Sequence, residues 1–397
     1  MKSIYDNSKI SFLMILVFFK PICFQYFSKT LIVDTLFVYA KILVAAIVLV
    51  ELLLSITVRM KITLNKLYLA IIAFEGWLLL MTIYHKGAVF RSFIDFISII
   101  VLTILITRAY RRNTMVFLNT FRNVIILLNL IQLITELIYR TGMPADLYYN
   151  NAGNPLYFVT LDNGTTGLSI LGITLVLLCK NLGIFIKRKR KIKFTIEIII
   201  CTLTAIFSGS STALLCTITF LIIVWISKFK ELKILEKSWI WAIIYVLLLT
   251  IVLLGENSII LQIISALTGK VGFTGRNLIW SKAIKMIKQS LFIGYGKLEH
   301  DYISIWNGFY SSHNVVLEIL LQGGIIAVIL WCISIWSGIK ETKKIFNFET
   351  KRILVSSLFM ILIGLMMEAS VHSVYLFSVI ALTYIEGNKI SLNIQNR

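Results

Sequence analysis

Residues 36–56 read LFVYAKILVAAIVLVELLLSI, an apolar stretch in which Lys41 and Glu51 are the charged residues. A run of this length crosses the hydrocarbon core of a bilayer as one helix. Lipid offers no partners for backbone groups, and the run lacks the alternation of a barrel strand, so a helix is the expected structure. The stretch therefore predicts a membrane-spanning helix.

Comparable runs recur through the 397-residue chain, which is 58% hydrophobic and contains three prolines. This composition excludes an ordinary soluble domain. We predict an all-α polytopic membrane protein with about twelve spans and a single integral membrane domain, residues 1–397. The expected spans are 10–27, 36–56, 67–84, 92–108, 115–138, 166–186, 194–208, 211–227, 238–254, 314–338, 351–367 and 371–388.

The net charge of +20 is concentrated in alternate connections, most densely in the run 187–193. This alternation follows the positive-inside rule, so we expect a multi-pass protein of the cytoplasmic membrane with both termini on the cytoplasmic side. The same distribution argues against nucleic acid as a partner. The basic run is instead expected to set topology and to contact anionic membrane lipids.

Metal and disulfide chemistry find no support in the sequence. The five cysteines lie within or beside apolar runs without CxxC spacing, which indicates packing residues. Glu299, His300 and Asp301 are adjacent, and adjacent side chains rarely converge on one ion. We therefore expect neither a metal site nor a cofactor, and the first span is expected to be retained rather than cleaved.

The predicted topology leaves two long outer connections, residues 139–165 and residues 255–312. The first is dense in Tyr, Asn, Gly and Asp, a composition that suits sugar hydroxyls but also fits a turn-rich loop. The second is the largest polar interruption of the membrane pattern. Any chemistry is expected to lie at this outer side.

Charged residues within the spans are costly in lipid and should face the bundle interior or reach its ends. Lys20 precedes Pro21 within a span and is the foremost candidate for a functional interior charge, with a structural role as the alternative. Glu368 and His372 stand four residues apart, so on a helix they would share a face and could orient one another. The other charges of this kind are Lys41, Glu51, Glu75, Asp95, Arg122, Glu136 and Glu197.

The large loop contains a predicted amphipathic interfacial helix, capped by Thr274 and continuing to Ser290. Its apolar side holds Ile279, Trp280, Ala283, Met286 and Ile287, and its polar side holds Lys282, Lys285 and Gln289. Arg276 projects with the apolar side in the first turn, where free N–H groups favour an anion. A guanidinium there suits a phosphate or diphosphate, with a structural ion pair as the alternative.

His313 precedes the next span, and Gly324 lies about three turns further on, within about 20° of the same helix stripe. A glycine below the histidine would let a neighbouring helix approach and hold the imidazole over an interhelical cleft. An outer histidine that titrates near neutrality is a candidate general base. Asn314 can bind a hydroxyl or orient a neighbour.

The stretches FTGRNLIWSKAIKMIKQSLFIGYG (273–296) and SSHNVVLEILLQGG (311–324) resemble the bacterial O-antigen polymerase and O-antigen ligase superfamily. Members share a Gly-Arg pair, a Trp, a Gly-Tyr-Gly block, a His-Asn pair and a later Gly. Here these are Gly275-Arg276, Trp280, Gly294-Tyr295-Gly296, His313-Asn314 and Gly324.

The resemblance implies metal-independent glycosyl transfer on the outer membrane face from a polyprenyl-diphosphate-linked oligosaccharide. Arg276 would hold the diphosphate and His313 would accept the acceptor proton, with Trp280 and Asn314 in the substrate site. Many members carry an arginine after a Ser-x-Ser element, whereas residues 208–212 read SGSST. Arg140 or Arg91 could supply that second cation.

Between the two activities the resemblance favours a polymerase for capsule or O-polysaccharide, since the ligases carry Gly, Thr or Tyr where this chain has Val328. A flippase and a chain-length regulator of the same pathway would then be partners. Ligase-type transfer is one alternative, and a transporter or flippase for lipid-linked sugars is another. A secondary transporter would show two related halves, which the sequence lacks, and a flippase would not need His313.

Overall fold

The structure is a computed structural model that describes residues 7–26, 31–59, 65–143, 156–185, 188–226, 237–254, 276–298 and 311–388. Within these ranges the regular elements are helices, and Leu156 and Leu161 form an isolated β-bridge. The prediction of an all-α protein is confirmed. Thr274 and the Glu299-His300-Asp301 run lie outside the described residues.

The helices follow the predicted spans closely. In chain order they are α1 Ser8–Leu16, η2 Val17–Phe19, α2 Cys23–Tyr26, α3 Leu31–Arg59, α4 Lys66–Tyr84, α5 Val89–Arg112, α6 Thr114–Ile138, α7 Thr165–Asn181, α8 Arg188–Phe207, α9 Ser211–Ile226, α10 Ser238–Leu254, α12 Arg276–Gln289, α14 Val315–Glu341, η6 Thr342–Lys344, α15 Phe348–Leu365 and α16 Val374–Gly387.

Some of these helices could span a membrane, judged by their length and apolar composition. Five of the described helices are long and apolar enough to cross a bilayer, and they are Ile32–Leu54, Lys66–Tyr84, Val89–Arg112, Thr114–Ile138 and Val315–Lys344. Other apolar helices are shorter, such as Thr165–Asn181 and Val374–Gly387. A multi-pass membrane protein is therefore supported, and the number of twelve spans stays a prediction.

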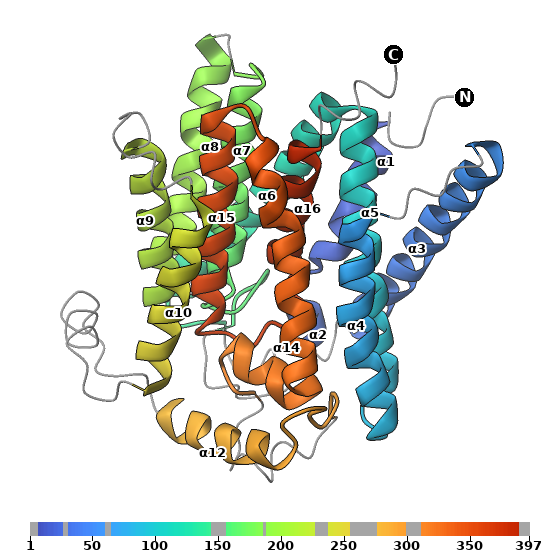
Figure 1. The fold of residues 1–397 in the computed structure, drawn as a ribbon. Coiled ribbons are helices and arrows are strands. Elements are labelled where there is room, and N and C mark those ends of the chain that lie inside the picture. Colours follow the sequence, from blue (N-terminus) through green and yellow to red (C-terminus); the bar gives the residue numbers. More distant parts are fainter. Residues whose placement is uncertain are drawn as a thin grey trace.

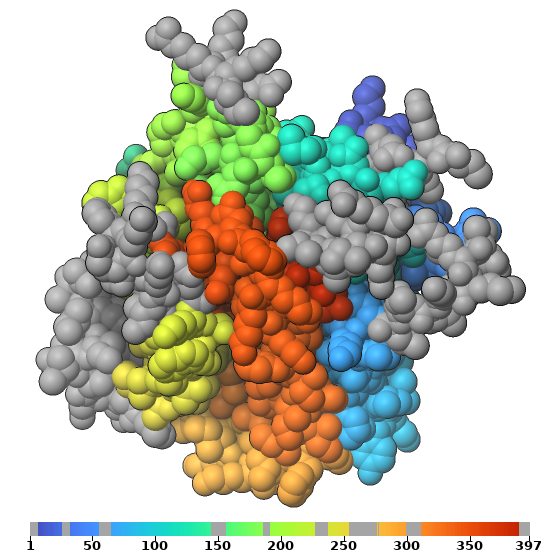
Figure 2. Space-filling model, turned by 45° about the horizontal axis from the view of Figure 1, so that its top comes forward, coloured from blue at the N-terminus to red at the C-terminus, as the bar shows by residue number. Residues whose placement is uncertain are grey.

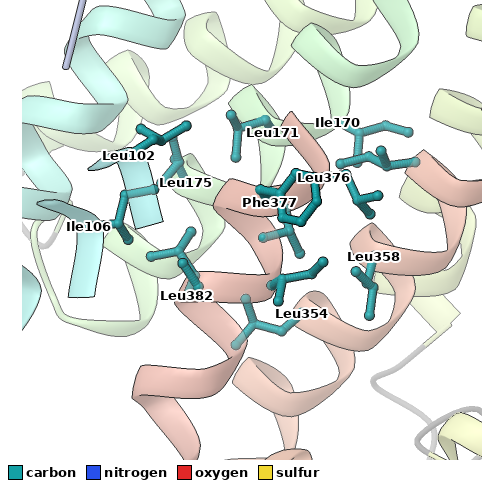
Figure 3. Close-up of a cluster of buried hydrophobic side chains, with 14 of the residues drawn as sticks. Leu102, Ile106, Ile170, Leu171, Leu175, Leu354, Leu358, Leu376, Phe377 and Leu382 are labelled. Carbon is teal, nitrogen blue, oxygen red and sulfur yellow. The ribbon is translucent and has the colours of Figure 1, made fainter. Parts of the chain in front are cut away.

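The helices form a bundle with α12 lying across one end (Figure 1), opposite the start of α1 and the end of α16. Figure 2 shows α12 beside α14, with α10 on one side of α14 and α4 on the other. At the centre of the bundle, apolar side chains from four helices point toward one another (Figure 3). They include Leu102 and Ile106 of α5, Leu171 and Leu175 of α7, Leu354 and Leu358 of α15, and Phe377 and Leu382 of α16.

The first predicted span, 10–27, is broken rather than continuous. After α1 and η2, Lys20 takes an extended ψ of 126°, because the ring of Pro21 disfavours a helical residue before it. The N–H groups of Ile22 and Cys23 donate to the carbonyls of Val159 and Phe158, at 3.0 and 3.2 Å. The freed backbone is thus satisfied by residues 156–161 instead of by lipid.

A second break lies inside α14, at Gly324, whose φ of 66° is left-handed and favours glycine. The carbonyls of Leu321 and Gln322 there accept from the N–H groups of Tyr295 and Gly296, at 2.7 and 2.9 Å. The Gly-Tyr-Gly block therefore pairs along the broken helix and supplies the hydrogen bonds that α14 loses.

This pairing corrects the role predicted for Gly324. A Cβ at that position would lie 2.2 Å from the backbone of Phe292, so the close neighbour is the segment after α12 and not another helix. A Cβ at Gly294 would lie 2.6 Å from the carbonyl oxygen of Leu321. The two glycines let two backbones meet, and that contact anchors the C-terminal end of α12 to α14.

Candidate active site

Helix α12 lies on the bundle through the apolar side that the sequence predicts. Ile279, Trp280, Ala283 and Ile287 are buried and pack against α14, while Lys285 is exposed. The amphipathic pattern of this helix is confirmed. Because its N-terminus holds Arg276 and its partner helix follows His313, this packing brings two predicted site residues to the same end of the bundle.

The segment that enters α14 is fixed by Ser312, which is fully buried. The indole N–H of Trp280 donates to the Ser312 carbonyl at 3.0 Å. The N–H and hydroxyl of Ser312 donate to one carboxylate oxygen of Glu318, at 3.0 and 2.9 Å. The polar group of Trp280 is therefore engaged with the protein, so this residue positions the histidine segment.

Asn314 caps α14 and ties it to the end of α15. Its side-chain oxygen accepts from the N–H groups of Val316 and Leu317, at 3.0 and 3.1 Å. Its side-chain nitrogen donates to the carbonyl of Met366 at 3.0 Å. Of the two roles that the sequence left open for Asn314, the geometry supports orientation of neighbours, because both amide atoms are occupied.

His313 stands between these two anchors with a φ of 48°, one of two positive values at non-glycine residues in the described ranges. Such a backbone is held only by its surroundings and is common at functional sites. The residue precedes the helix cap, so the prediction that His313 and Gly324 share one helix stripe is wrong. Its imidazole forms no hydrogen bond with the residues that the structure describes.

Arg276 lies close to this imidazole. Burial, followed by the charge of Arg276, lowers the pKa of His313 to about 4. The imidazole is therefore neutral at physiological pH and has a lone pair available. The Arg276 guanidinium is half-buried and approaches the sulfur of Met367 at 3.5 Å.

Two acidic residues surround Arg276 without pairing with it. Burial lowers the pKa of Arg276, and the charges of Asp162 and Glu368 oppose that shift, so both carboxyl groups lie in its electrostatic range. Among the described residues it forms no ion pair within 4.0 Å. The cation is thus held in a partly dry site, where one guanidinium nitrogen donates to the Met367 sulfur and no carboxylate of the described residues pairs with the fork.

The prediction that Glu368 and His372 orient one another is wrong. The connection between α15 and α16 is not helical there, and the two residues have different partners. Glu368 accepts from the Ser370 hydroxyl at 2.6 Å, and burial raises its pKa against the opposing charge of Arg276. The ring of His372 instead lies 2.8 Å from a carboxylate oxygen of Glu75.

His372 belongs to a charge network that joins distant helices. Its second ring nitrogen lies 3.8 Å from Asp95, which is paired with Lys297. Burial lowers the pKa of His372, but the carboxylates of Glu75 and Asp95 outweigh burial and raise it. The network links α4, α5, the segment after α12 and the start of α16, so we assign His372 a positioning role.

A cavity of about 200 Å³ opens beside this site. Its wall includes Lys20, Thr160, Thr166, Glu368, His372 and Tyr375. Glu368 lies on this wall and also within electrostatic range of Arg276. The ammonium group of Lys20, at the break of the first helix, is paired with Asp34.

The two arginines proposed as a second phosphate ligand are placed elsewhere. Arg91 is exposed in the first turn of α5, and Arg140 is exposed just after α6. Neither belongs to the described lining of the cavity, where Lys20 supplies a cation instead. The Lys20-Pro21 pair was a readable signal for this placement, whereas nothing in the sequence singled out Asp162.

Residues 196–332 match the family model described as O-Antigen ligase. The match confirms the resemblance drawn from residues 273–324, and it contains Arg276, Trp280 and His313. Members of this family are glycosyltransferase-like enzymes of polymerase or ligase type. The chain matches none of the curated proteins. Lys20, Glu368 and His372 lie outside the matched range.

Proposed function

The chain belongs to the O-antigen ligase and polymerase superfamily, and we propose that it polymerises lipid-linked oligosaccharide repeat units into a surface polysaccharide. The donor is a glycan on a polyprenyl diphosphate, and the transfer takes place on the outer face of the cytoplasmic membrane. The observation that carries this proposal is the proximity of Arg276, half-buried and without an ion pair among the described residues, to a neutral histidine whose backbone is left-handed.

Arg276 is suited to the diphosphate of the donor. The forked donors of a guanidinium bind phosphate oxygens in pairs, and partial burial strengthens that interaction relative to water. In the transfer the bond between the anomeric carbon and the diphosphate oxygen breaks, and the electron pair leaves with the lipid diphosphate. Arg276 stabilises the negative charge that grows on this leaving group.

His313 is suited to the acceptor. The acceptor hydroxyl forms the new bond to the anomeric carbon and releases its proton to a free ring nitrogen of His313. A pKa of about 4 describes the site without donor, where the Arg276 charge repels a proton. A bound diphosphate neutralises that charge and adds negative charge of its own, which raises the pKa of His313 toward the range of an effective base.

The polymerase reading is preferred to ligase-type transfer because Val328 departs from the ligase pattern. A flippase for the same lipid would use a cationic surface but would have no need for a neutral base next to Arg276. A flippase and a chain-length regulator are then expected to be separate proteins that act in the same pathway as this chain.

The test is reconstitution of the purified protein in vesicles with a polyprenyl-diphosphate repeat unit, followed by gel analysis of glycan length. Wild type is expected to lengthen the glycan, and His313→Ala to do so about 10²–10⁴-fold more slowly, the usual contribution of acid–base catalysis. Unchanged growth with His313→Ala would remove this residue from the mechanism. Movement of the lipid across the bilayer without any chain growth would favour the flippase.

A further inference from the structure

The cavity next to Glu368 is lined by polar side chains, and one of them has no hydrogen-bond partner among the described residues. Thr166 is 3% exposed, and its hydroxyl finds no hydrogen-bond partner among the described residues. Thr166 lies on the cavity wall in the first turn of α7. A buried hydroxyl without a partner costs free energy, so its retention on a cavity wall points to a ligand that completes it.

The chemistry of the wall is mixed in a way that fits a carbohydrate. Lys20 offers donors, the carboxyl group of Glu368 offers acceptors, and Tyr375 offers both an aromatic ring and a hydroxyl. Hydroxyl-rich ligands use such donors and acceptors together, while an aromatic face covers the C–H side of a sugar ring. Neither a purely apolar ligand nor a bare anion would use all of these groups.

The size and position of the cavity further limit which ligands could bind there. Its volume of about 200 Å³ lies below the roughly 300–1,000 Å³ of sites for drug-sized ligands, so it suits one small unit. The backbone of Ile22 and the 156–161 segment meet there, and the break before Pro21 keeps Lys20 beside the cavity. Glu368 lies on the cavity wall and within electrostatic range of Arg276, so the occupant would share this acidic neighbour with the diphosphate site.

We propose that this cavity is the subsite for a single sugar ring of the glycan that the enzyme transfers or extends. The inference rests on the proposed function, which supplies the glycan, but it assigns a pocket outside the range matched by the family model. In this subsite the Thr166 hydroxyl and the Glu368 carboxyl group bind ring hydroxyls, and Tyr375 covers the apolar side of the ring.

The experiment uses the full chain in nanodiscs and two probes. One is the polyprenyl-diphosphate repeat unit, and the other is the same oligosaccharide after release from the lipid diphosphate. Binding of the released oligosaccharide is measured by calorimetric titration, and the Michaelis constant is measured for the lipid-linked donor. If a cavity variant changes only the Michaelis constant for the lipid-linked donor, the sugar ring in the subsite belongs to the donor. If it also weakens binding of the released oligosaccharide, the ring belongs to the acceptor chain.

Thr166→Val keeps the shape of the side chain and removes its hydroxyl. It is expected to weaken the binding of one or both probes about 3- to 10-fold, which is the effect of one hydrogen bond. Ser169→Ala is the matched control. Ser169 lies on the same helix and also has a fully buried hydroxyl without a described partner, but it is not on the cavity wall. Removal of the Ser169 hydroxyl is expected to leave the binding of both probes unchanged.

Val374→Phe places a ring into the cavity from the start of α16 and is expected to weaken binding by more than Thr166→Val. Wild-type binding of both probes by Thr166→Val and by a folded Val374→Phe would overturn the subsite. Arg276→Gln separates the two proposals. It should nearly abolish transfer of the lipid-linked repeat unit and keep binding of the released oligosaccharide. A wild type that binds the released oligosaccharide but never transfers the lipid-linked repeat unit would refute only the proposed function.

Discussion

Two arginines of this molecule, Arg122 and Arg276, have opposite surroundings. Arg122 on α6 is 2% exposed, lies 3.5 Å from the carboxylate of Glu197 and stands 5.0 Å over the ring of Phe185. Arg276 at the start of α12 is half-buried and has acidic neighbours in range, but it forms no ion pair among the described residues. The first charge is compensated by the protein, and the second is left for a ligand.

This contrast separates a structural charge from a functional charge within a membrane bundle. A compensated pair joins two helices, here α6 and α8, and its loss should affect the fold. A half-buried cation without an ion pair contributes little to folding and should affect substrate binding and turnover. The four predictions below test whether the two sites divide in this way.

The largest effect is expected for Arg276→Gln in the chain-growth assay. Removal of one preorganised charge at the leaving group should reduce turnover roughly 10²–10³-fold, with little change in the melting temperature. Arg276→Lys keeps the charge without the fork and should fall between wild type and Arg276→Gln. A large drop in melting temperature for both variants would place Arg276 with Arg122 as a structural charge.

Arg122→Gln should act on stability instead. It leaves Glu197 buried without its main partner, which costs about 3 kcal/mol. The value lies at the lower end for broken buried pairs because Lys193 still reaches Glu197 at 3.7 Å. Thermal unfolding in detergent measures the effect, and the double variant Arg122→Met, Glu197→Leu should recover most of it. Equal stability of Arg122→Gln and wild type would contradict the assignment.

Trp280→Phe tests the scaffold that holds His313. The substitution keeps the aromatic packing and removes the N–H bound to the Ser312 carbonyl, so the histidine segment loses one anchor. Turnover should fall about 10-fold through misplacement of the base. Trp331→Phe is the control, because the N–H of the buried Trp331 has no partner among the described residues. Equal turnover of the two variants would remove Trp280 from the positioning of His313.

The smallest effect concerns the titration of His313. Because the Arg276 charge helps to depress its pKa to about 4, Arg276→Gln should raise that pKa toward the ordinary value of 6.5. Histidine NMR of selectively labelled protein follows the ring directly. The pKa of His313 in the folded state also sets how stability depends on pH. Because this pKa is depressed, its contribution to the free energy of unfolding is present above pH 6.5 and is lost as the pH falls toward 4. A lower pKa in Arg276→Gln would contradict the proximity of the two groups.

The sequence predicted those features that depend on local pattern. The apolar side of α12 follows from helical periodicity, and the placement of Arg276 against the bundle follows from the same geometry. The break at Lys20-Pro21 was signalled by proline, although the sequence reading kept that span continuous. These features need only neighbouring residues for their explanation.

The features that the sequence missed depend on partners far along the chain. Glu75 and His372 meet across 297 positions, which no local spacing reveals. The break at Gly324 requires the carbonyls of Leu321 and Gln322 to find Tyr295 and Gly296, so the glycine alone suggested only close helix packing. The misreading of Glu368 and His372 has the same origin, since a non-helical connection ended the periodicity on which their pairing relied.

The role of Arg276 at the diphosphate is tested most directly by measuring how much polyprenyl diphosphate is released during transfer. With radiolabelled polyprenyl-diphosphate repeat units in vesicles, wild type should release one polyprenyl diphosphate for each new glycosidic bond. Arg276→Gln should nearly abolish both the release and the bonds, while Arg122→Met, Glu197→Leu retains both. Polymer growth at the wild-type rate in Arg276→Gln would show that this arginine does not bind the diphosphate during transfer.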